Sequence, residues 1–284
     1  MQFNKEYKDR LFRHLFGREE KKENIISLYN AINNTTYTDP SDFEITTLQD
    51  AIYIKMKNDV SLLVDSNLVL WEQQSSYNPN MPLRGLMYFG ELYNGYISRK
   101  HINIYGETLV NIPTPQYIVF YNGTKEQESV RKLRLSDAFA CKTDSRDFEW
   151  TAIMYNLNRG KNDELLQKCK PLADYMKFIN YIRDYQNAGY SIEEAIDLAV
   201  QRCIEEDILK EYLLKHRAEV KAMVITEFNE EVFRNGIKEE GRAEGKIEEL
   251  ISLVKDKLLE LDVAAQRCNM SVEDFSKLLK SNNP

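Results

Sequence analysis

The residues best suited to chemistry are two acids, Asp59 and Glu72, that flank a predicted β-hairpin. Two β-rich runs lie between them, and the polar segment Asp65-Ser66-Asn67 separates the runs, which is typical of a tight turn. If the first two residues of this segment form the turn, Asp59 faces Glu72. If the last two form it, Asp59 faces Gln74. Either register puts the two acids and Gln74 on one face of the hairpin, because side chains alternate along a strand.

Carboxylates placed in this way are suited to a divalent cation. Directly opposed residues have Cβ atoms ~4.5–5.5 Å apart, and two carboxylates that close repel each other unless one is protonated or a cation lies between them. Oxygen ligands favour Mg²⁺, for which Mn²⁺ is a substitute, and the backbone carbonyl of Gln73 is a candidate third ligand. In the plainer alternative, Asp59 begins a solvated strand and Glu72 is a surface carboxylate.

Two further residue pairs have helical spacing and stand near the hairpin in the chain. Arg84 and Tyr88 are four residues apart in a predicted helix that begins near Pro82. Arg84 is placed to pair with Glu72 or to clamp a phosphate, and a structural ion pair is the alternative. Asp9 and Arg13 are also four apart, in a predicted first helix, where a plain surface pair is the alternative.

The remaining elements predict an α/β domain to about residue 160, followed by helices. The apolar run Gln116-Tyr-Ile-Val-Phe-Tyr121 predicts a central strand, and residues 51–59 look extended. The β signal fades after about residue 150. Ser191 and Glu194 form a predicted capping box. The periodicity of apolar residues predicts helices over residues 5–33, 162–184, 191–217 and 218–234.

Composition and missing motifs exclude several classes of protein. The chain has 284 residues and a net charge of −7, so a strongly basic nucleic-acid footprint is absent. No apolar run approaches ~20 residues, which argues against a membrane helix. The first residues lack an apolar signal core, so we expect a cytoplasmic protein. No GxxxxGK[ST] or GxGxxG motif occurs, and nucleotide use is not indicated.

Several blocks of the sequence together resemble a known family. The central blocks are Asn58-Asp59-Val60-Ser61, Leu70-Trp71-Glu72-Gln73-Gln74-Ser75-Ser76 and Asn78-Pro79-Asn80-Met81-Pro82-Leu83-Arg84. Further blocks are Tyr7-Lys8-Asp9, Leu11-Phe12-Arg13, Ile112-Pro113-Thr114-Pro115, Val119-Phe120-Tyr121-Asn122-Gly123, Leu133-Arg134-Leu135-Ser136-Asp137-Ala138 and Glu240-Gly241-Arg242-Ala243-Glu244-Gly245-Lys246. These blocks look like the Rpn family, bacterial recombination-promoting nucleases, also called transposase-like, of the PD-(D/E)xK superfamily.

The resemblance implies a restriction-endonuclease-like core, a mixed central sheet flanked by helices, followed by an all-helical C-terminal region. It implies a magnesium-dependent DNA endonuclease, a hydrolase acting on phosphodiester bonds and associated with recombination or mobile DNA. Asp59 matches the first metal-binding acid of the superfamily and Glu72 the second. Gln74 stands where the superfamily has lysine, so its amide would orient a water without supplying positive charge. The superfamily sometimes adds an acid from the first helix, which makes Asp9 a candidate metal or water ligand.

The C-terminal residues predict tail helices over 239–284. Ile247, Ile251, Val254, Leu258 and Leu261 form a short a/d seam. The seam fits either docking within the chain or a homodimer. We therefore expect a nuclease-like domain over 1–160 and a helical region over 161–284, with DNA as the partner. A catalytically weak or inactive DNA-associated or assembly protein that retains the nuclease fold is the alternative.

Overall fold

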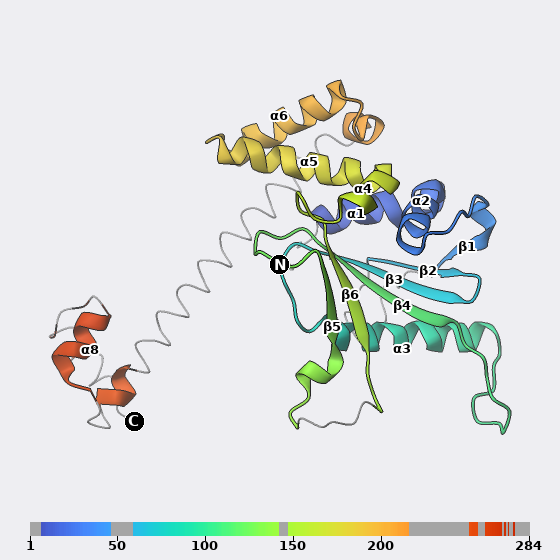
Figure 1. Cartoon of the computed structure of the whole chain (residues 1–284), viewed down its shortest axis with the longest axis horizontal. Helices are drawn as coiled ribbons and strands as arrows, with labels where there is room; N and C mark the ends of the chain where they lie inside the picture. The colour runs from blue at the N-terminus through green and yellow to red at the C-terminus, as the bar shows by residue number, and fades with distance from the viewer. Residues whose placement is uncertain are drawn as a thin grey trace. The chain divides into compact units, whose positions relative to one another are not determined.

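The computed structural model describes residues 7–46, 59–141, 147–215, 250–254, 259–268, 270, 272 and 275. Its strands are β1 (Phe43–Ile45), β2 (Val60–Val64), β3 (Asn67–Gln74), β4 (Thr114–Tyr121), β5 (Val130–Arg134) and β6 (Thr151–Asn156). They form one six-stranded sheet in the order β1-β2-β3-β4-β6-β5 (Figure 1). β3, β4 and β6 are parallel, and the other neighbours pair antiparallel. The expected α/β class with a mixed central sheet is confirmed.

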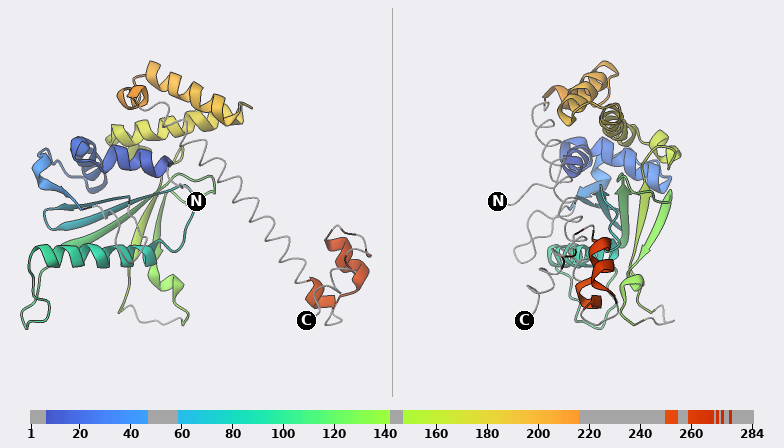
Figure 2. Two further views of the ribbon diagram at one scale, coloured as in Figure 1. Left: turned by 180° about the vertical axis from the view of Figure 1, so that it is seen from behind. Right: turned by 90° about the vertical axis from the view of Figure 1, so that its left-hand side faces the viewer.

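Helices cover both faces of this sheet, as Figures 1 and 2 show. The helices of this part are α1 (Tyr7–Phe16), α2 (Lys22–Asn33), α3 (Met81–Arg99), α4 (Asp163–Lys168), α5 (Lys170–Asn187) and α6 (Ile192–Glu205). α3 lies on one face and contacts β4, β5 and β6. α1 contacts β3 on the other face, where α2, α4 and α5 gather, and α6 packs on α5. The central strands are therefore covered on both sides, which explains their nearly continuous apolar sequence.

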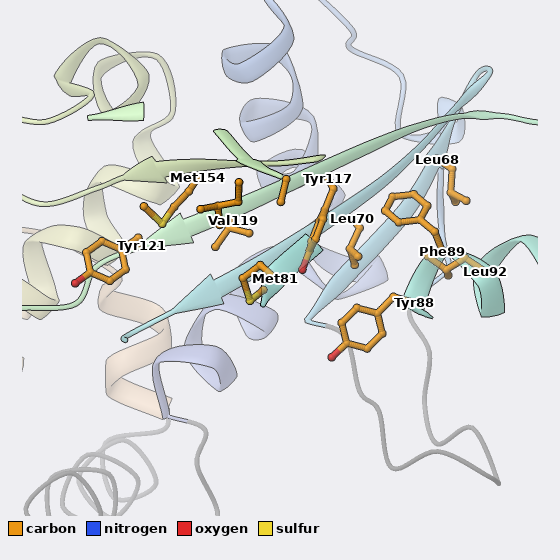
Figure 3. Close-up of a cluster of buried hydrophobic side chains, with 12 residues drawn as sticks. Leu68, Leu70, Met81, Tyr88, Phe89, Leu92, Tyr117, Val119, Tyr121 and Met154 are labelled. Atoms are coloured by element: carbon orange, nitrogen blue, oxygen red, sulfur yellow. The ribbon is translucent and has the colours of Figure 1, made fainter. Parts of the chain in front are cut away.

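Each face of the sheet has its own apolar cluster. Beneath α3, twelve buried residues form one cluster, and Figure 3 shows Val119 and Met154 in it among side chains of β3, β4 and α3. On the opposite face aromatic rings dominate: Phe12 lies 5.4 Å from Phe120, and Phe16 lies 6.5 Å from Trp71, measured between ring centroids. These clusters fix α1 and α3 against the two faces of β3, the strand that carries Glu72.

Gly85 allows α3 to lie close to the sheet. A Cβ atom at this position would lie 2.3 Å from a ring carbon of Tyr117 and 3.2 Å from Nε1 of Trp150. We expect Gly85→Ala to destabilise the protein by ~1–3 kcal/mol, because the buried ring of Tyr117 must shift to make room. Urea unfolding measures this change.

Gly90 provides a matched control in the same helix. A Cβ atom there would meet nothing within 4 Å, so Gly90→Ala should stabilise α3 by ~0.5–1 kcal/mol through helix propensity alone. If both alanine variants were equally stable, close approach at Gly85 would not be what positions α3.

The first and the later predicted helices are shorter than the sequence periodicity suggests. The helix expected over 5–33 ends at Phe16, and a 3-10 turn (Glu19–Lys21) precedes α2. Gly17 follows that end, and its N–H donates to the carbonyl of Arg13 at 2.7 Å. The break fits the low helix propensity of glycine.

The helix expected over 162–184 is also two helices, because Cys169 is extended between α4 and α5. Pro171 is the second residue of α5, and its ring would clash with the carbonyl four residues earlier in a continuous helix. The helix expected over 191–217 breaks after Glu205, where Asp207 and Leu209 have positive φ. The capping box of Ser191 and Glu194 is confirmed.

Three strands were not anticipated from the sequence, namely β1, β5 and β6. The expectation that β structure fades after about residue 150 is wrong, because β6 (Thr151–Asn156) pairs with both β4 and β5. Its alternating burial makes it a half-buried strand. The helix predicted over 218–234 and the extended residues 51–58 lie outside the described residues.

The chain divides into two compact units, Glu6–Val224 and Ile225–Pro284 together with Met1–Lys5. The expected boundary at residue 160 falls inside the first unit, since α4 and α5 pack on α2. In the second unit, α8 (Leu261–Arg267) contributes Ala264 and Ala265 to a buried cluster. Ile251, one seam residue, is buried in the same cluster, whereas Ile247 and Leu258 lie outside the described residues. Ile251 therefore docks within its own unit.

Candidate functional site at the end of the β2–β3 hairpin

The hairpin has the register that brings Asp59 opposite Glu72. Val64 pairs with Asn67 and Val60 with Trp71, so Asp65 and Ser66 form the turn. Asp65 has a positive φ of 50°, which aspartate tolerates better than most residues. Asp59 directly precedes β2 and is continuous with this register. The first of the two turns considered from the sequence is therefore correct.

The Asp59 carboxylate lies at the strand end, turned toward the plane of the sheet. Its Oδ2 atom accepts a hydrogen bond of 2.7 Å from the backbone N–H of Gln73. Its Oδ1 atom lies 3.9 Å from Nε of Arg13 on α1. The side chain is only 12% exposed. Asp59 is thus a fixed, nearly buried carboxylate rather than the start of a solvated strand.

The Glu72 carboxylate points toward α3 and is held from two sides. Its Oε1 atom accepts from the backbone N–H of Asp59 at 3.3 Å, and its Oε2 atom accepts from Nη2 of Arg84 at 3.1 Å. The Glu72 side chain is 2% exposed and that of Arg84 is 34% exposed. Glu72 is therefore not the surface carboxylate of the plainer alternative, and Arg84 forms the ion pair with Glu72 that was one of the alternatives considered for it.

The two carboxylates are close enough to alter each other's titration. Burial raises the pKa of Glu72 well above its usual value, and the charge of Asp59 raises it further, while Arg84 opposes both effects. Burial disfavours the charge on Arg84, but Glu72, Tyr88 and Tyr117 together outweigh it and raise the pKa of the guanidinium. The ionised form of Glu72 is thus disfavoured mainly by burial and further by the neighbouring Asp59.

The two acids are drawn toward different layers, which the hairpin argument did not anticipate. Arg13 approaches Asp59 from the α1 side, whereas Arg84 approaches Glu72 from the α3 side. The expectation that both side chains share one face holds for Glu72, but the Asp59 carboxylate turns to cap the backbone of Gln73. The physical reason is that the N–H of Gln73 lies beyond the last pair of β2 and β3, Val60 with Trp71, and the Asp59 carboxylate accepts from it there.

Two tyrosines line the α3 side of the site. Nη2 of Arg84 donates to the hydroxyl of Tyr88 at 2.9 Å, and the guanidinium lies 5.6 Å from the centre of the Tyr88 ring. The Tyr117 hydroxyl is buried and has no hydrogen-bond partner among the described residues. Burial, and then the charge of Glu72, raises the pKa of both tyrosines. Figure 3 shows Tyr88 and Tyr117 on this side of the sheet.

The sequence alone does not mark Tyr117 as a site residue, because its neighbours are distant in the chain. It lies on β4, in the predicted strand Gln116–Tyr121, where an aromatic residue indicates only a buried strand. Parallel pairing sets Val119 beside Glu72, and Tyr117 is two residues earlier on the same face. Only the pairing of β3 with β4 brings its hydroxyl near the acids.

The side chain of Gln73 points to the opposite face. Its Nε2 donates to Oδ1 of Asn122 at 2.8 Å, and Nδ2 of Asn122 donates to the hydroxyl of Tyr175 on α5 at 3.0 Å. The carbonyl of Gln73 is the atom predicted as a metal ligand. Within a strand, the N–H and C=O of one residue point toward the same neighbour, so this carbonyl is directed to the side on which Asp59 lies.

The remaining predicted site residues differ in how well they are placed. Gln74 is the last residue of β3 and is half-buried; its backbone carbonyl accepts from the N–H of Asn122 at 3.1 Å. Its side-chain amide forms no hydrogen bond within the described part of the chain, and alternation puts it on the Glu72 face. Asp9 belongs to α1, one turn before Arg13, but its side chain lies outside the described residues.

No protein-family model, curated protein or solved structure matches this chain. Over the described residues, no group of three or more His, Cys, Asp or Glu side chains is arranged to hold a metal ion. Likewise, none of the helices described is long and apolar enough to span a membrane. What the site contains is therefore a close pair of acids, two flanking arginines and two tyrosine hydroxyls at one end of the sheet.

Proposed function

We propose that this protein is a metal-dependent DNA endonuclease with a restriction-endonuclease-like core, acting in recombination or on mobile DNA. The observation that carries the proposal is the convergence of Asp59 and Glu72 at the end of the β2–β3 hairpin, where Oε1 of Glu72 lies 3.3 Å from the backbone nitrogen of Asp59. An acid before one strand and a Glu-x-Gln on the next, flanked by helices on both faces, is the arrangement that the resemblance to Rpn nucleases implies.

The donors at this strand end fit Mg²⁺. The two carboxylates and the carbonyl of Gln73 are hard oxygen donors. Burial and then the charge of Asp59 raise the pKa of Glu72, and a divalent cation between the two carboxylates would offset both effects. Asp59, Glu72 and the Gln73 carbonyl would hold the ion, with Mn²⁺ as a substitute. A bound divalent ion would supply an acidified water and positive charge for the phosphate oxygens.

The protein's own groups position these donors. The Gln73 N–H and Arg13 fix the Asp59 carboxylate, and Arg84 fixes Glu72. The unpaired amide of Gln74 is suited to orient the attacking water by hydrogen bonds. Because Gln74 carries no charge, Arg84, which is one-third exposed, is the cation best placed to meet the phosphate.

The burial of Glu72 favours a second candidate function, a catalytically weak or inactive DNA-associated or assembly protein. Glu72 is 2% exposed and already paired with Arg84, and glutamine stands in place of lysine at position 74. In such a protein the Glu72–Arg84 pair would be structural. Calorimetric titration with Mg²⁺ or Mn²⁺ separates the two functions, because a nuclease binds metal through Asp59 and Glu72 whereas the degenerate protein does not. A homodimer through the C-terminal helices stays a prediction in either case.

The experiment that tests the proposal is cleavage of supercoiled plasmid with and without Mg²⁺ or Mn²⁺. We expect nicked or linear DNA only when the ion is present, and none after chelation. The same assay with Glu72→Gln should give little or no product, because the variant loses one anionic ligand. Equal cleavage by wild type and Glu72→Gln would contradict the proposed site, and absence of both cleavage and metal binding in the wild type would favour the inactive protein.

A further inference from the structure

A cluster of an aromatic ring and two cations lies beyond the acids, at the same end of the sheet. It consists of Tyr77, in the segment after β3, Lys125, in the segment after β4, and Arg131 on β5; we call it the Tyr77 cluster. The Arg131 guanidinium carbon lies 5.1 Å from the centre of the Tyr77 ring, and Nζ of Lys125 lies 5.6 Å from it. Both cations are at distances typical of a cation–π contact.

The register of the sheet puts this cluster on the same face as Glu72. Glu72 pairs with Val119, Val119 with Met154, and Met154 with Arg131. Residues that pair directly point to the same face. These four residues therefore form one row across β3, β4, β6 and β5, with Glu72 at one end and Arg131 at the other. Figure 3 shows Val119 and Met154, the middle of this row, together on that face. Three strand spacings of ~4.8 Å separate the ends, about 14 Å in all.

The two cations are not neutralised by neighbouring acids. Neither Lys125 nor Arg131 forms an ion pair with any residue that the structure describes, whereas Glu126 of the same segment pairs with Lys161 at 3.2 Å. Glu128 is the other acid of this segment and is exposed. Arg131 donates instead to the neutral Oε1 of Gln127 at 3.2 Å. The positive charge at the Tyr77 cluster is therefore left for an external anion.

The backbone that carries the cluster is held firmly. The Tyr121 hydroxyl donates to the carbonyl of Lys125 at 2.6 Å, and Nδ2 of Asn156 donates to the carbonyl of Gln127 at 2.9 Å. A Cβ atom on Gly123 would lie 2.4 Å from the carbonyl oxygen of Ser75, so the segments that bear Tyr77 and Lys125 are in close contact. A preorganised pair of cations costs little ordering entropy when it binds an anion.

We propose that the Tyr77 cluster binds the phosphate backbone of a DNA strand and aligns it along the end of the sheet at which β3 and β4 finish, so that a phosphate further along reaches Asp59 and Glu72. This inference rests on the proposed function and names the surface through which the substrate is held. A span of about 14 Å corresponds to roughly four steps of ~3.4 Å along one strand of a duplex. Phosphate contacts of this kind position DNA without reading its sequence.

The test is DNA binding measured without divalent ions, which separates binding from cleavage. Fluorescence anisotropy of a labelled 30-base-pair duplex is compared for wild type and for the double variant Lys125→Ala/Arg131→Ala. We expect the variant to bind at least about 10-fold more weakly at 50 mM salt, and the slope of log K against log salt to fall by about 1.8, since each phosphate contact contributes ~0.9.

A matched control removes the same charge from the opposite face. Lys132 and Arg134 lie on β5 beside Arg131, are exposed and alternate with it. Lys132→Ala/Arg134→Ala should therefore bind DNA like the wild type. Circular dichroism of both double variants confirms that they fold. If the cluster variant binds as the wild type does, or if both double variants weaken binding equally, the inference is wrong.

The outcome is distinguishable from failure of the proposed nuclease. If the wild type cleaves DNA and the cluster variant binds DNA normally, the proposed nuclease function is supported and the inference about the Tyr77 cluster is wrong. If the cluster variant binds DNA more weakly and the wild type cleaves DNA with none of the metal ions tested, the Tyr77 cluster is a DNA-binding surface and the proposed nuclease function is wrong.

Discussion

Replacing Asp59 with asparagine is expected to lower metal-dependent plasmid cleavage by at least ~100-fold, because removing even an outer partner of a metal ligand costs ~10–100-fold. Asparagine keeps the shape and an oxygen for the Gln73 N–H, which Asp59 accepts at 2.7 Å. What it removes is the charge that faces the cation. The measurement is the initial rate of nicking at a fixed Mg²⁺ concentration, with metal affinity from calorimetry.

The same substitution at the other end of the hairpin is the control. Asp65 lies in the turn with a positive φ, which asparagine also adopts, so Asp65→Asn should cleave like the wild type. Gln74→Ala should reduce the rate less than Asp59→Asn, because its amide only orients water. Undiminished nicking by Asp59→Asn would show that this carboxylate is not part of the catalytic centre.

Glu72→Gln is expected to make the metal-free protein more stable at neutral and alkaline pH, although it loses cleavage. The pKa of Glu72 in the folded protein is raised above its usual value, which is ~4.3 in the unfolded chain. At a pH between these two pKa values, the native state binds a proton that the unfolded state lacks. The stability that this proton contributes is fully present below the unfolded pKa and is lost as pH rises through the folded pKa.

Glutamine resembles the protonated acid and does not titrate, so the gain in unfolding free energy relative to wild type should grow with pH. The gain should be largest at pH 8 and is limited by the charge left on Arg84, whose side chain is 34% exposed and keeps partial hydration. Urea unfolding between pH 5 and 8 in the presence of a chelator measures this difference. Added Mg²⁺ should stabilise the wild type and not the variant.

The control for this prediction is Glu44→Gln on β1, where the side chain is 51% exposed and paired with Arg99. Its effect on stability should stay within ~0.5 kcal/mol and vary little with pH over this range. If Glu72→Gln were less stable than wild type at every pH, the ion pair with Arg84 would outweigh the strain between the two acids, and the site would be structural.

Local patterns were enough to predict the hairpin and the acids. The turn residues and the alternation of β2 and β3 left two registers, both with Asp59 and Glu72 on one face, because hairpin pairing depends on neighbours in the chain. The structure has the register that sets Asp59 opposite Glu72. The helical spacing of Arg84 and Tyr88 was likewise sufficient to put them side by side. Short-range geometry leaves few alternatives at such positions.

The short strands and helix breaks were harder to predict. β1 and β5 have only three and five residues, too few for a clear period. Their pairing partners, rather than their own sequence, make them strands. The break at Cys169 depends on Pro171, a local signal that was present in the sequence but not used.

Only the tertiary structure determined which residues surround Asp59 and Glu72. Arg13 reaches Asp59 from α1 and Tyr117 lies beside Glu72 through β4, contacts that follow from parallel pairing and helix packing across long stretches of chain. The raised pKa of Glu72 and the row that ends at Arg131 have the same origin. Sequence spacing sets which residues share a strand or a helix face, whereas burial, charge and strand order arise when distant segments pack together.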